Sequence, residues 1–464
     1  MQTHDIVVIG AGPAGLAAAT TAAGFGLSVL LIDDQPAPGG QIYRNVERAE
    51  ALGHAAGLGA DYRRGASLTT ALRASGVIYL PGWQVWQIEP EGRLFANADG
   101  RTEEIGWRRL VIAIGALERA VPIPGWTLPG VMTVGAAQIL LKTGGVLPDE
   151  DVWIAGSGPL PLLYAAQVIA AGGRIGGFID TRRSANRWRA LAHLPGALRN
   201  WPYLQKGIAT TRILRRAGIP RITEVDAVEA VGAERLTSVR WRQRGVWHEQ
   251  KAGGLLLHEG VVPHVHMTMS LGCTHDWDPV QRCFRPRLDD WGRTDTRGVI
   301  VAGDAGGIFG ARAAEIRGKL AALGAAAELG KVPLQERDRQ AAAWRRELAA
   351  HVAIRPFLDH LFAPPPSLLA PADDVVLCRC EGVTAGQIRE AVDLGCLGPN
   401  QAKSFTRAGM GPCQGRICGL SVTTTIAAAR GVSSAEIGFY RVRPPLKPLT
   451  LGEVAALLRD DVPT

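Results

Sequence analysis

Four cysteines in the last quarter of the chain have the spacing of a metal or cluster site. They occur as Cys378-Arg-Cys380 and as Cys413-Gln-Gly-Arg-Ile-Cys418. Thiolates on two tight turns can wrap one compact inorganic unit, and nearby glycines free backbone amides to hydrogen-bond its sulfur atoms. Zinc competes, because four cysteines also suit a structural tetrahedral site. The C-x-C spacing is tight for one zinc, so electron-transfer chemistry elsewhere in the chain would favour an iron-sulfur unit.

A glycine-rich turn near the N-terminus indicates a dinucleotide site. Gly10-Ala-Gly12-Pro-Ala-Gly15 follows an apolar strand pattern and precedes an alanine-rich helix pattern. Gly10 allows the tight turn, Gly12 lets a pyrophosphate approach the backbone, and Gly15 lets helix and strand pack closely. The next apolar strand pattern ends in Asp33, whose carboxylate can accept hydrogen bonds from a ribose diol. Strand, turn, helix and acid together predict a bound dinucleotide.

Three further stretches favour FAD over NAD as that dinucleotide. The stretch that ends in Gly303-Asp304 resembles the second FAD signature of two-dinucleotide-binding-domain flavoproteins, in which the Asp contacts the ribityl chain. Val111-Ile-Ala-Ile-Gly115 resembles the strand and turn where the chain leaves the FAD domain. Gly39-Gly40-Gln41 resembles the stretch beside the flavin, although two glycines also suit a plain turn. A helix pattern after Asp304 would direct its N-terminal amides towards negative charge on a reduced flavin.

A second glycine-rich turn, Gly156-Ser-Gly158-Pro-Leu-Pro161, begins another strand-turn-helix pattern. Pro161 takes the place of the third glycine, where it removes an amide and adds bulk. The following strand pattern ends at Asp180, and the arginines after it have a spacing like those that bind an NADPH phosphate in thioredoxin-reductase-like enzymes. They are Arg182, Arg183 and Arg187. Both a working NAD(P)H site and a retained scaffold domain are compatible with this stretch.

Composition and charge narrow the class of protein. The 464 residues are 47% hydrophobic and 20% charged, with 57 glycines, which is typical of a compact α/β protein with more than one core. The net charge is +8, and the segment from Thr181 to Arg221 contains ten Arg or Lys and no acid. This segment is a candidate partner surface, and because no nucleic-acid motif accompanies it we predict no DNA or RNA binding. The chain has no long apolar stretch and no leader pattern at its N-terminus, so we expect a cytoplasmic protein.

The order of motifs predicts an α/β fold with a split Rossmann-type FAD domain, an inserted NAD(P)-like domain and a small C-terminal iron-sulfur domain. Polar helical sequence and a run of prolines indicate a linker before the cysteines. The expected boundaries are 1–118 and 256–335 for the FAD domain, 119–255 for the inserted domain, 336–370 for a helical linker, 371–435 for the cluster domain and 436–464 for a tail.

The cysteine segment resembles the bacterioferritin-associated-ferredoxin-like domain, whose four cysteines hold a 2Fe-2S cluster. That family usually closes with C-x2-C, whereas this chain has C-x4-C. The resemblance implies that Cys378, Cys380, Cys413 and Cys418 ligate a 2Fe-2S cluster. The other cysteines, Cys273, Cys283 and Cys396, are interpreted as packed thiols.

Nearly the whole chain resembles the FAD-binding α subunits of heteromeric amino-acid and opine dehydrogenases. The matching stretches are GGQIYR, LHEGVVPH, VAGDAGG, CRCEGVT, KSFTRAGMGPCQGRICG and RVRPPLKPLTLGEVA. In such complexes a separate FAD-containing β subunit, similar to amino-acid oxidases, oxidises the C–N bond. The resemblance also implies a possible FMN between subunits, a possible small ferredoxin-like γ subunit, and at most peripheral membrane association. It implies that this chain relays electrons.

The sequence contains no recognisable acid-base or nucleophile pair for a substrate. His258, Glu259, His264 and His266 lie near the expected flavin strand, but isolated histidines are more often structural. Two alternatives to the electron-relay function stay open. One is a self-sufficient NAD(P)H-dependent reductase that feeds the cluster, and the other is a cluster-bearing scaffold without redox turnover.

Overall fold

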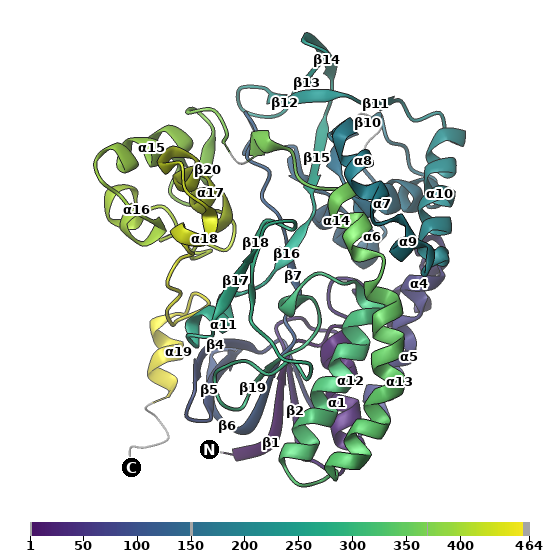
Figure 1. Ribbon diagram of the computed structural model, residues 1–464, viewed down its shortest axis with the longest axis vertical. Helices are drawn as coiled ribbons and strands as arrows, with labels where there is room; N and C mark the ends of the chain where they lie inside the picture. The colour runs from purple at the N-terminus through teal and green to yellow at the C-terminus, as the bar shows by residue number, and fades with distance from the viewer. Residues whose placement is uncertain (1, 149–151, 369, 458–464) are drawn as a thin grey trace.

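A computed structural model describes residues 2–148, 152–368 and 370–457 of the chain. Figure 1 shows a lower α/β unit built around β1, an upper α/β unit around β15, and a separate group of short helices that ends at α18. Among the described residues, none of the helices combines the length and the apolar character that a membrane crossing requires.

The lower unit contains a seven-stranded sheet in the order β3-β2-β1-β6-β5-β4, with β19 added next to β6. The strands β3, β2, β1, β6 and β19 are parallel, and β4 and β5 form an antiparallel extension. Because β19 comes from a much later part of the chain, this unit is assembled from two separate segments. The bounds are β1 Gln2–Ile9, β2 Val29–Asp33, β3 Ile78–Pro81, β4 Gln84–Glu89, β5 Arg93–Ala98, β6 Arg101–Ile112 and β19 Val299–Val301.

Alanine-rich helices cover one face of this sheet. Helices α1 (Pro13–Gly24) and α12 (Ala311–Glu328) pack closely together, and α5 (Gly65–Arg73) packs beside α1. Small side chains let the backbones approach, so the two segments of the unit share one core. Shorter elements connect this unit to the rest: α2 Val46–Ala51, α3 Ala55–Leu58, α4 Ala60–Arg63, α11 His266–Ser270, β17 His275–Asp278, β18 Cys283–Pro286 and the 3-10 helix η1 Gly303–Gly306.

The upper unit contains a second parallel sheet in the order β11-β10-β9-β15-β8. A three-stranded antiparallel sheet, β12-β13-β14, adjoins it, and the pair β7 and β16 joins the two units. Its strands are β7 Ala116–Glu118, β8 Val131–Thr133, β9 Val152–Ser157, β10 Gly177–Asp180, β11 Arg221–Ile222, β12 Val225–Val231, β13 Ser238–Gln243, β14 Val246–Lys251, β15 Gly254–Glu259 and β16 Val261–Pro263. Its helices are α6 Val134–Gly144, α7 Pro159–Ala170, α8 Ser184–Leu191, α9 Leu194–Leu198 and α10 Trp201–Arg216.

Two linker helices hold the upper and lower units together. Helix α13 (Leu334–Val352) packs on α12, and α14 (Arg355–Leu361) packs on α8 and α9. The side-chain amides of Asn186 and Asn200 donate to the backbone carbonyls of Ala363 and Ala350, each over 3.1 Å. A short 3-10 helix, η2 (Pro366–Leu368), follows.

The cysteine-bearing group has its own small core. It consists of β20 Val376–Cys378, β21 Val383–Thr384, α15 Ala385–Asp393, α16 Pro399–Thr406, α17 Gly419–Arg430 and α18 Ser434–Ile437. Thr384 begins α15 with a capping box in which Gln387 completes the reciprocal hydrogen bonds. The tail returns to the lower unit, where α19 (Leu451–Ala456) packs on β6.

A buried lysine ties the upper unit to the loop after β2. Lys142 on α6 is 3% exposed, and its Nζ donates to the backbone oxygen of Gln41 (3.0 Å) and to Oε1 of Gln138 (2.8 Å). Burial, helped by the nearby charge of Arg44, lowers the pKa of Lys142 to about 7. None of the described carboxylates forms an ion pair with this amine.

Replacing Lys142 should change the pH dependence of stability. The pKa of Lys142 is about 7 in the folded chain and 10.5 in the unfolded chain. At pH values between these two, the amine is protonated only in the unfolded chain. The free energy of unfolding therefore rises with pH in this window, by at most about 1.4 kcal/mol per pH unit. Lys142→Met should flatten that rise, which denaturant unfolding from about pH 7 to about pH 9 will measure. The exposed Lys251→Met is the control, and equal slopes for both variants and the parent would contradict this assignment.

Candidate functional site

A cavity of about 780 Å³ lies where the lower and upper units meet. Its walls come from the loops at the carboxyl ends of β1, β2 and β6, from the start of α12, and from the upper unit. At such loop ends, open α/β sheets bind their ligands. Of the predicted flavin-site residues, Gly10, Gly12, Asp33, Gly40, Gln41, Gly115 and Asp304 line the cavity, whereas Gly15, Gly39 and Gly303 do not.

The first glycine turn is shaped by contacts and by open space. A Cβ on Gly15 would lie 1.7 Å from the oxygen of Gly10, so only glycine lets α1 start against this turn. At Gly12 the situation differs, because an added Cβ would meet no protein atom closer than the Cα of Gly40 at 3.8 Å. Packing does not require glycine at position 12. Its position on the cavity wall fits a ligand that must approach the backbone.

Two acids mark the cavity, Asp33, which is buried, and Asp304, which is partly buried. Asp33 accepts hydrogen bonds from the backbone amides of Ala11 and Gln35, and burial raises its pKa to about 6. Asp304 accepts from the amides of Phe309 and Gly310, over 2.9 and 3.2 Å, and burial raises its pKa as well. Both carboxylates are thereby held in fixed positions at the cavity wall. They can accept hydroxyl hydrogen bonds from a ribose or a ribityl chain.

The stretch Gly39-Gly40-Gln41 closes another side. The amide of Gly39 donates to the oxygen of Ala11 over 2.8 Å, and a Cβ on Gly40 would lie 2.7 Å from the Cα of Gly12. The side-chain oxygen of Gln41 accepts from Arg44 over 3.1 Å. These contacts hold the stretch against the first glycine turn, along the cavity.

The second glycine turn packs against His258, and its residue Gly158 lines the cavity. A Cβ on Gly156 would meet the oxygen of His258 at 1.8 Å, and one on Gly158 would meet the His258 ring at 3.2 Å. His258 is buried, and its Nδ1 lies 2.5 Å from Oε1 of Glu118, which also accepts from the amide of Gly135. Helix α7 begins here with Pro159.

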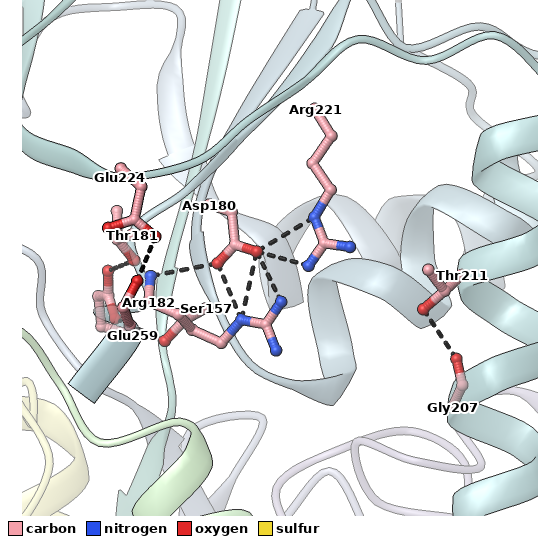
Figure 2. A network of polar contacts seen from close by, with 10 residues as sticks. Ser157, Asp180, Thr181, Arg182, Gly207, Thr211, Arg221, Glu224 and Glu259 are labelled. Atoms are coloured by element: carbon pink, nitrogen blue, oxygen red, sulfur yellow. Dashed lines mark hydrogen bonds and ion pairs between the residues drawn. The ribbon is translucent and has the colours of Figure 1, made fainter. Parts of the chain in front are cut away.

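Asp180, the acid that could bind a ribose in the upper unit, is already paired (Figure 2). Its carboxylate lies 2.7 Å from Nη2 of Arg182 and 2.5 Å from Nη2 of Arg221, and it is 2% exposed. Burial alone would raise the pKa of Asp180, but the hydrogen bond and charge of Arg182 and the charge of Arg221 outweigh it and lower the pKa. Arg182 is therefore engaged within the protein, while Arg183 and Arg187 are exposed.

Glu259 forms a second buried polar contact beside this pair (Figure 2). Its carboxyl group accepts hydrogen bonds from Thr181 (2.5 Å) and Ser157 (3.0 Å), and burial raises its pKa to about 7. Glu259 lines the cavity from the end of β15.

Several cavity residues carry no local sequence signal. Helix α14 contributes Arg355, Leu358 and Asp359, and the cysteine-bearing group and tail contribute Arg416 and Lys447. These side chains reach the cavity only because distant segments pack there. The contact between Glu118 on β7 and His258 on β15 is also a tertiary contact. The sequence pattern drew attention to the histidine and not to its glutamate partner.

The four predicted ligand cysteines come together in two neighbouring pairs. Cys378 is the hydrogen-bond partner of Cys418, which lowers the pKa of the Cys378 thiol to about 6, assisted by the Gly409 amide at 3.4 Å. Cys380 contacts the thiol and the backbone amide of Cys413. A Cβ on Gly411 would lie 2.2 Å from the Cβ of Cys380, so the two cysteine loops approach closely.

The remaining cysteines are also buried, Cys396 in the same small core and Cys273 and Cys283 elsewhere. Cys273 contacts Thr296, and Cys396 donates to the oxygen of Gly398. Burial raises the pKa of Cys283 to about 12. All seven cysteines are free of disulfides, and Cys380 is the exposed one among them.

Comparison with known proteins identifies the fold and the relatives. Residues 4–320 match the model of the pyridine nucleotide-disulphide oxidoreductase family, and residues 376–457 match the sarcosine oxidase A3 domain. The solved structure of L-proline dehydrogenase from P. horikoshii is similar, with a TM-score of 0.71 and 20% identity over 98% of this chain and 80% of that one. The predicted α/β two-dinucleotide-binding-domain fold is thus confirmed.

Two curated relatives match over nearly their whole length. The opine oxidase A-subunit of Rhizobium meliloti is 46% identical over 99% of this chain and 100% of its own length. The hydrogen cyanide synthase subunit HcnB of Pseudomonas aeruginosa is 33% identical over 96% of each chain. The chain is therefore a flavoprotein oxidoreductase of the pyridine nucleotide-disulphide oxidoreductase family and belongs, within it, with the opine oxidase A-subunits.

Proposed function

We propose that this chain is the FAD- and 2Fe-2S-bearing, electron-transferring subunit of a heteromeric dye- or quinone-linked amino-acid or opine dehydrogenase. The observation that carries the proposal is the position of the cysteine-bearing group, which supplies part of the wall of the dinucleotide cavity. A partner subunit oxidises the C–N bond of the substrate, and this chain accepts the electrons. Relatives named as A-subunits of oxidases support a multi-subunit enzyme.

The residues around the cavity fit FAD. Gly12 leaves the backbone open to a pyrophosphate, Asp33 suits the adenosine ribose, and Asp304 suits the ribityl chain. Helices α1 and α12 both begin at the cavity, so their N-terminal amides favour negative charge there. Bound FAD takes up an electron pair or single electrons, and a 2Fe-2S cluster passes single electrons.

The cysteine arrangement fits two iron atoms better than one zinc. A single tetrahedral metal needs its ligands to converge on one point. Among the described residues, no group of three or more His, Cys, Asp or Glu side chains is placed to hold one metal ion. The pairs of Cys378 with Cys418 and Cys380 with Cys413 suit a unit in which two irons each take two thiolates.

The segment from Thr181 to Arg221 supplies a basic surface for a partner. Three of its ten cations are paired, Arg182 and Arg221 with Asp180 and Lys206 with Asp61. The others are exposed: Arg183, Arg187, Arg189, Arg199, Arg212, Arg215 and Arg216. Large apolar side chains are exposed among them, namely Trp188, Leu191, Leu198, Trp201, Ile208 and Ile213. Arginine and tryptophan commonly anchor protein interfaces, and the absence of acids favours an acidic partner face.

An NAD(P)H-dependent reductase finds less support than the electron-transfer function. Asp180 is neutralised by two arginines, and Pro161 replaces the third glycine of the second turn. We therefore assign the upper unit a structural role. The FMN and the γ subunit are implied by the family resemblance alone.

Gly12→Ala should weaken FAD binding by about tenfold or more, because its methyl group occupies space that the phosphate needs. The backbone at Gly12 (φ −76°) suits alanine, so the variant should fold normally. Asp304→Ala should also lose FAD on dialysis. The control is Gly24→Ala in α1, where an added Cβ meets no atom within 4 Å. Full FAD retention by both site variants after dialysis would contradict the assignment.

Purified chain should contain equal amounts of iron and acid-labile sulfide. Changing Cys378, Cys380, Cys413 or Cys418 to alanine, one at a time, should bleach the cluster absorbance, because each thiolate holds one iron position. Cys396→Ala changes a buried thiol of the same small core and should keep the cluster. Zinc without sulfide in the parent protein would refute the iron-sulfur assignment.

The isolated chain should not oxidise amino acids. With proline, hydroxyproline, glycine or opines and an artificial dye, it should show background dye reduction until the partner subunit is added.

Charge reversal of Arg187 and Arg189 should weaken assembly with that partner, measured by analytical ultracentrifugation at low and high salt. Reversal of Arg48 and Arg297, exposed arginines outside the basic surface, is the control.

Strong dye reduction by the chain alone would place the substrate site here and overturn the proposed electron-transfer role. Rapid bleaching of its flavin by NADPH would favour the reductase instead.

A further inference from the structure

The cysteine-bearing group and the tail reach the lower unit beside the FAD cavity. The amide of Leu446 donates to the backbone oxygen of Trp86 over 2.6 Å, and Nζ of Lys447 lies 2.9 Å from Oδ2 of Asp34. Lys447 and Arg416 both line the cavity. Two cations therefore enter the cavity from a part of the chain that follows the lower unit in sequence.

Arg416 occupies a particular place, because it lies in the loop between Cys413 and Cys418. Its Nη1 donates to the oxygen of Leu446 over 2.7 Å, and the neighbouring Gln414 donates to the oxygen of Pro445 over 2.5 Å. Arg416 also lies within electrostatic range of Cys413 and Asp34. One guanidinium thus lies between the cysteines and Asp34, the residue that follows β2.

The cavity wall around Arg416 has polar groups without protein partners. Arg44 is 7% exposed and donates to Gln35 and Gln41, yet its Nε has no partner among the described residues. Nε2 of His264, another cavity residue, likewise has none there. Lys447 is paired with Asp34, whereas none of the described carboxylates lies in ion-pair contact with Arg416. An anionic ligand can satisfy the buried Nε of Arg44 and can also bind the partly exposed Arg416.

The position of Asp33 indicates which part of a bound dinucleotide would lie near Arg416. It marks the adenosine ribose end, and Asp34 and Gln35 follow it directly on the same wall. The nearest anion of FAD to that ribose is the diphosphate. Arg416 is therefore placed on the ADP side of the cavity, where a guanidinium can bind phosphate oxygens.

We infer that Arg416 is a phosphate-binding residue for FAD supplied by the cysteine loop, so that cluster assembly and FAD retention are coupled. The inference rests on the proposed function and adds a residue and a dependence to it. An ordered cysteine loop holds Arg416 at the cavity wall. When the loop loses its inorganic unit, the guanidinium loses that support and the dinucleotide loses a charged contact.

The test compares FAD dissociation constants, measured by flavin fluorescence on full-length chain, for the parent, Arg416→Gln, Arg416→Lys and Cys413→Ser. Arg416→Gln should weaken FAD binding by about tenfold or more, with iron and sulfide unchanged, because a charge-assisted contact is lost. Arg416→Lys should recover part of that loss. Cys413→Ser should lose the cluster and weaken FAD binding by a similar factor.

Lys403→Gln is the matched control, since Lys403 packs on Tyr440 near the cysteines but does not line the cavity. The double variant Arg416→Gln with Cys413→Ser should be no weaker than either single variant, because both act through one contact. Parent-like FAD affinity in Arg416→Gln, or in Cys413→Ser after cluster loss, overturns the inference. The parent's own iron, sulfide and flavin content tests the proposed function separately, and a parent without flavin would overturn both.

Discussion

The close crossing of α1 and α12 over the first glycine turn is the contact on which the site depends. A Cβ on Gly318 of α12 would lie 2.1 Å from the oxygen of Ala14, so the two helices touch through their backbones. This contact joins the first segment of the lower unit to the segment that returns after the upper unit. It also brings the N-termini of both helices to one cavity. Any larger residue at Gly318 would separate the helices, and the cavity would lose one of its two positive helix ends.

The lower unit could be predicted because its signals are local. The Gly10 turn and the acid at Asp33 each follow an apolar strand, and the spacing alone fixes their order along the sheet. Asp304 follows β19 in the same way. The motif also gives Gly12 and Gly15 different roles, the approach of a pyrophosphate and the packing of helix on strand. The structure adds the contacts: Gly12 lines the cavity, whereas a Cβ on Gly15 would meet the oxygen of Gly10.

The remaining cavity walls could not be predicted, because they are tertiary contacts. Residues of α14 carry an ordinary helical pattern, and nothing in it indicates packing on α8 and α9. The arginines after Asp180 favoured a phosphate site when considered by sequence distance. In the structure the buried carboxylate takes Arg182 and adds Arg221 from β11. A buried carboxylate is costly unless it is paired. Arg182 therefore pairs with Asp180 instead of binding a ligand phosphate.

The small core around the cysteines gives those thiols a structural role as well. Cys378 and Cys418 are both 1% exposed and belong to the same hydrophobic cluster as Ile388 and Ile426. Tyr440 packs against Gly409 and Gly415, where a Cβ would lie 2.6 Å from its ring. A core of this size gains little from apolar burial alone, and small domains commonly depend on a bound inorganic unit for their stability. The loop that carries Arg416 lies between two of these thiols, Cys413 and Cys418, so the packing of this small core also sets part of the cavity wall.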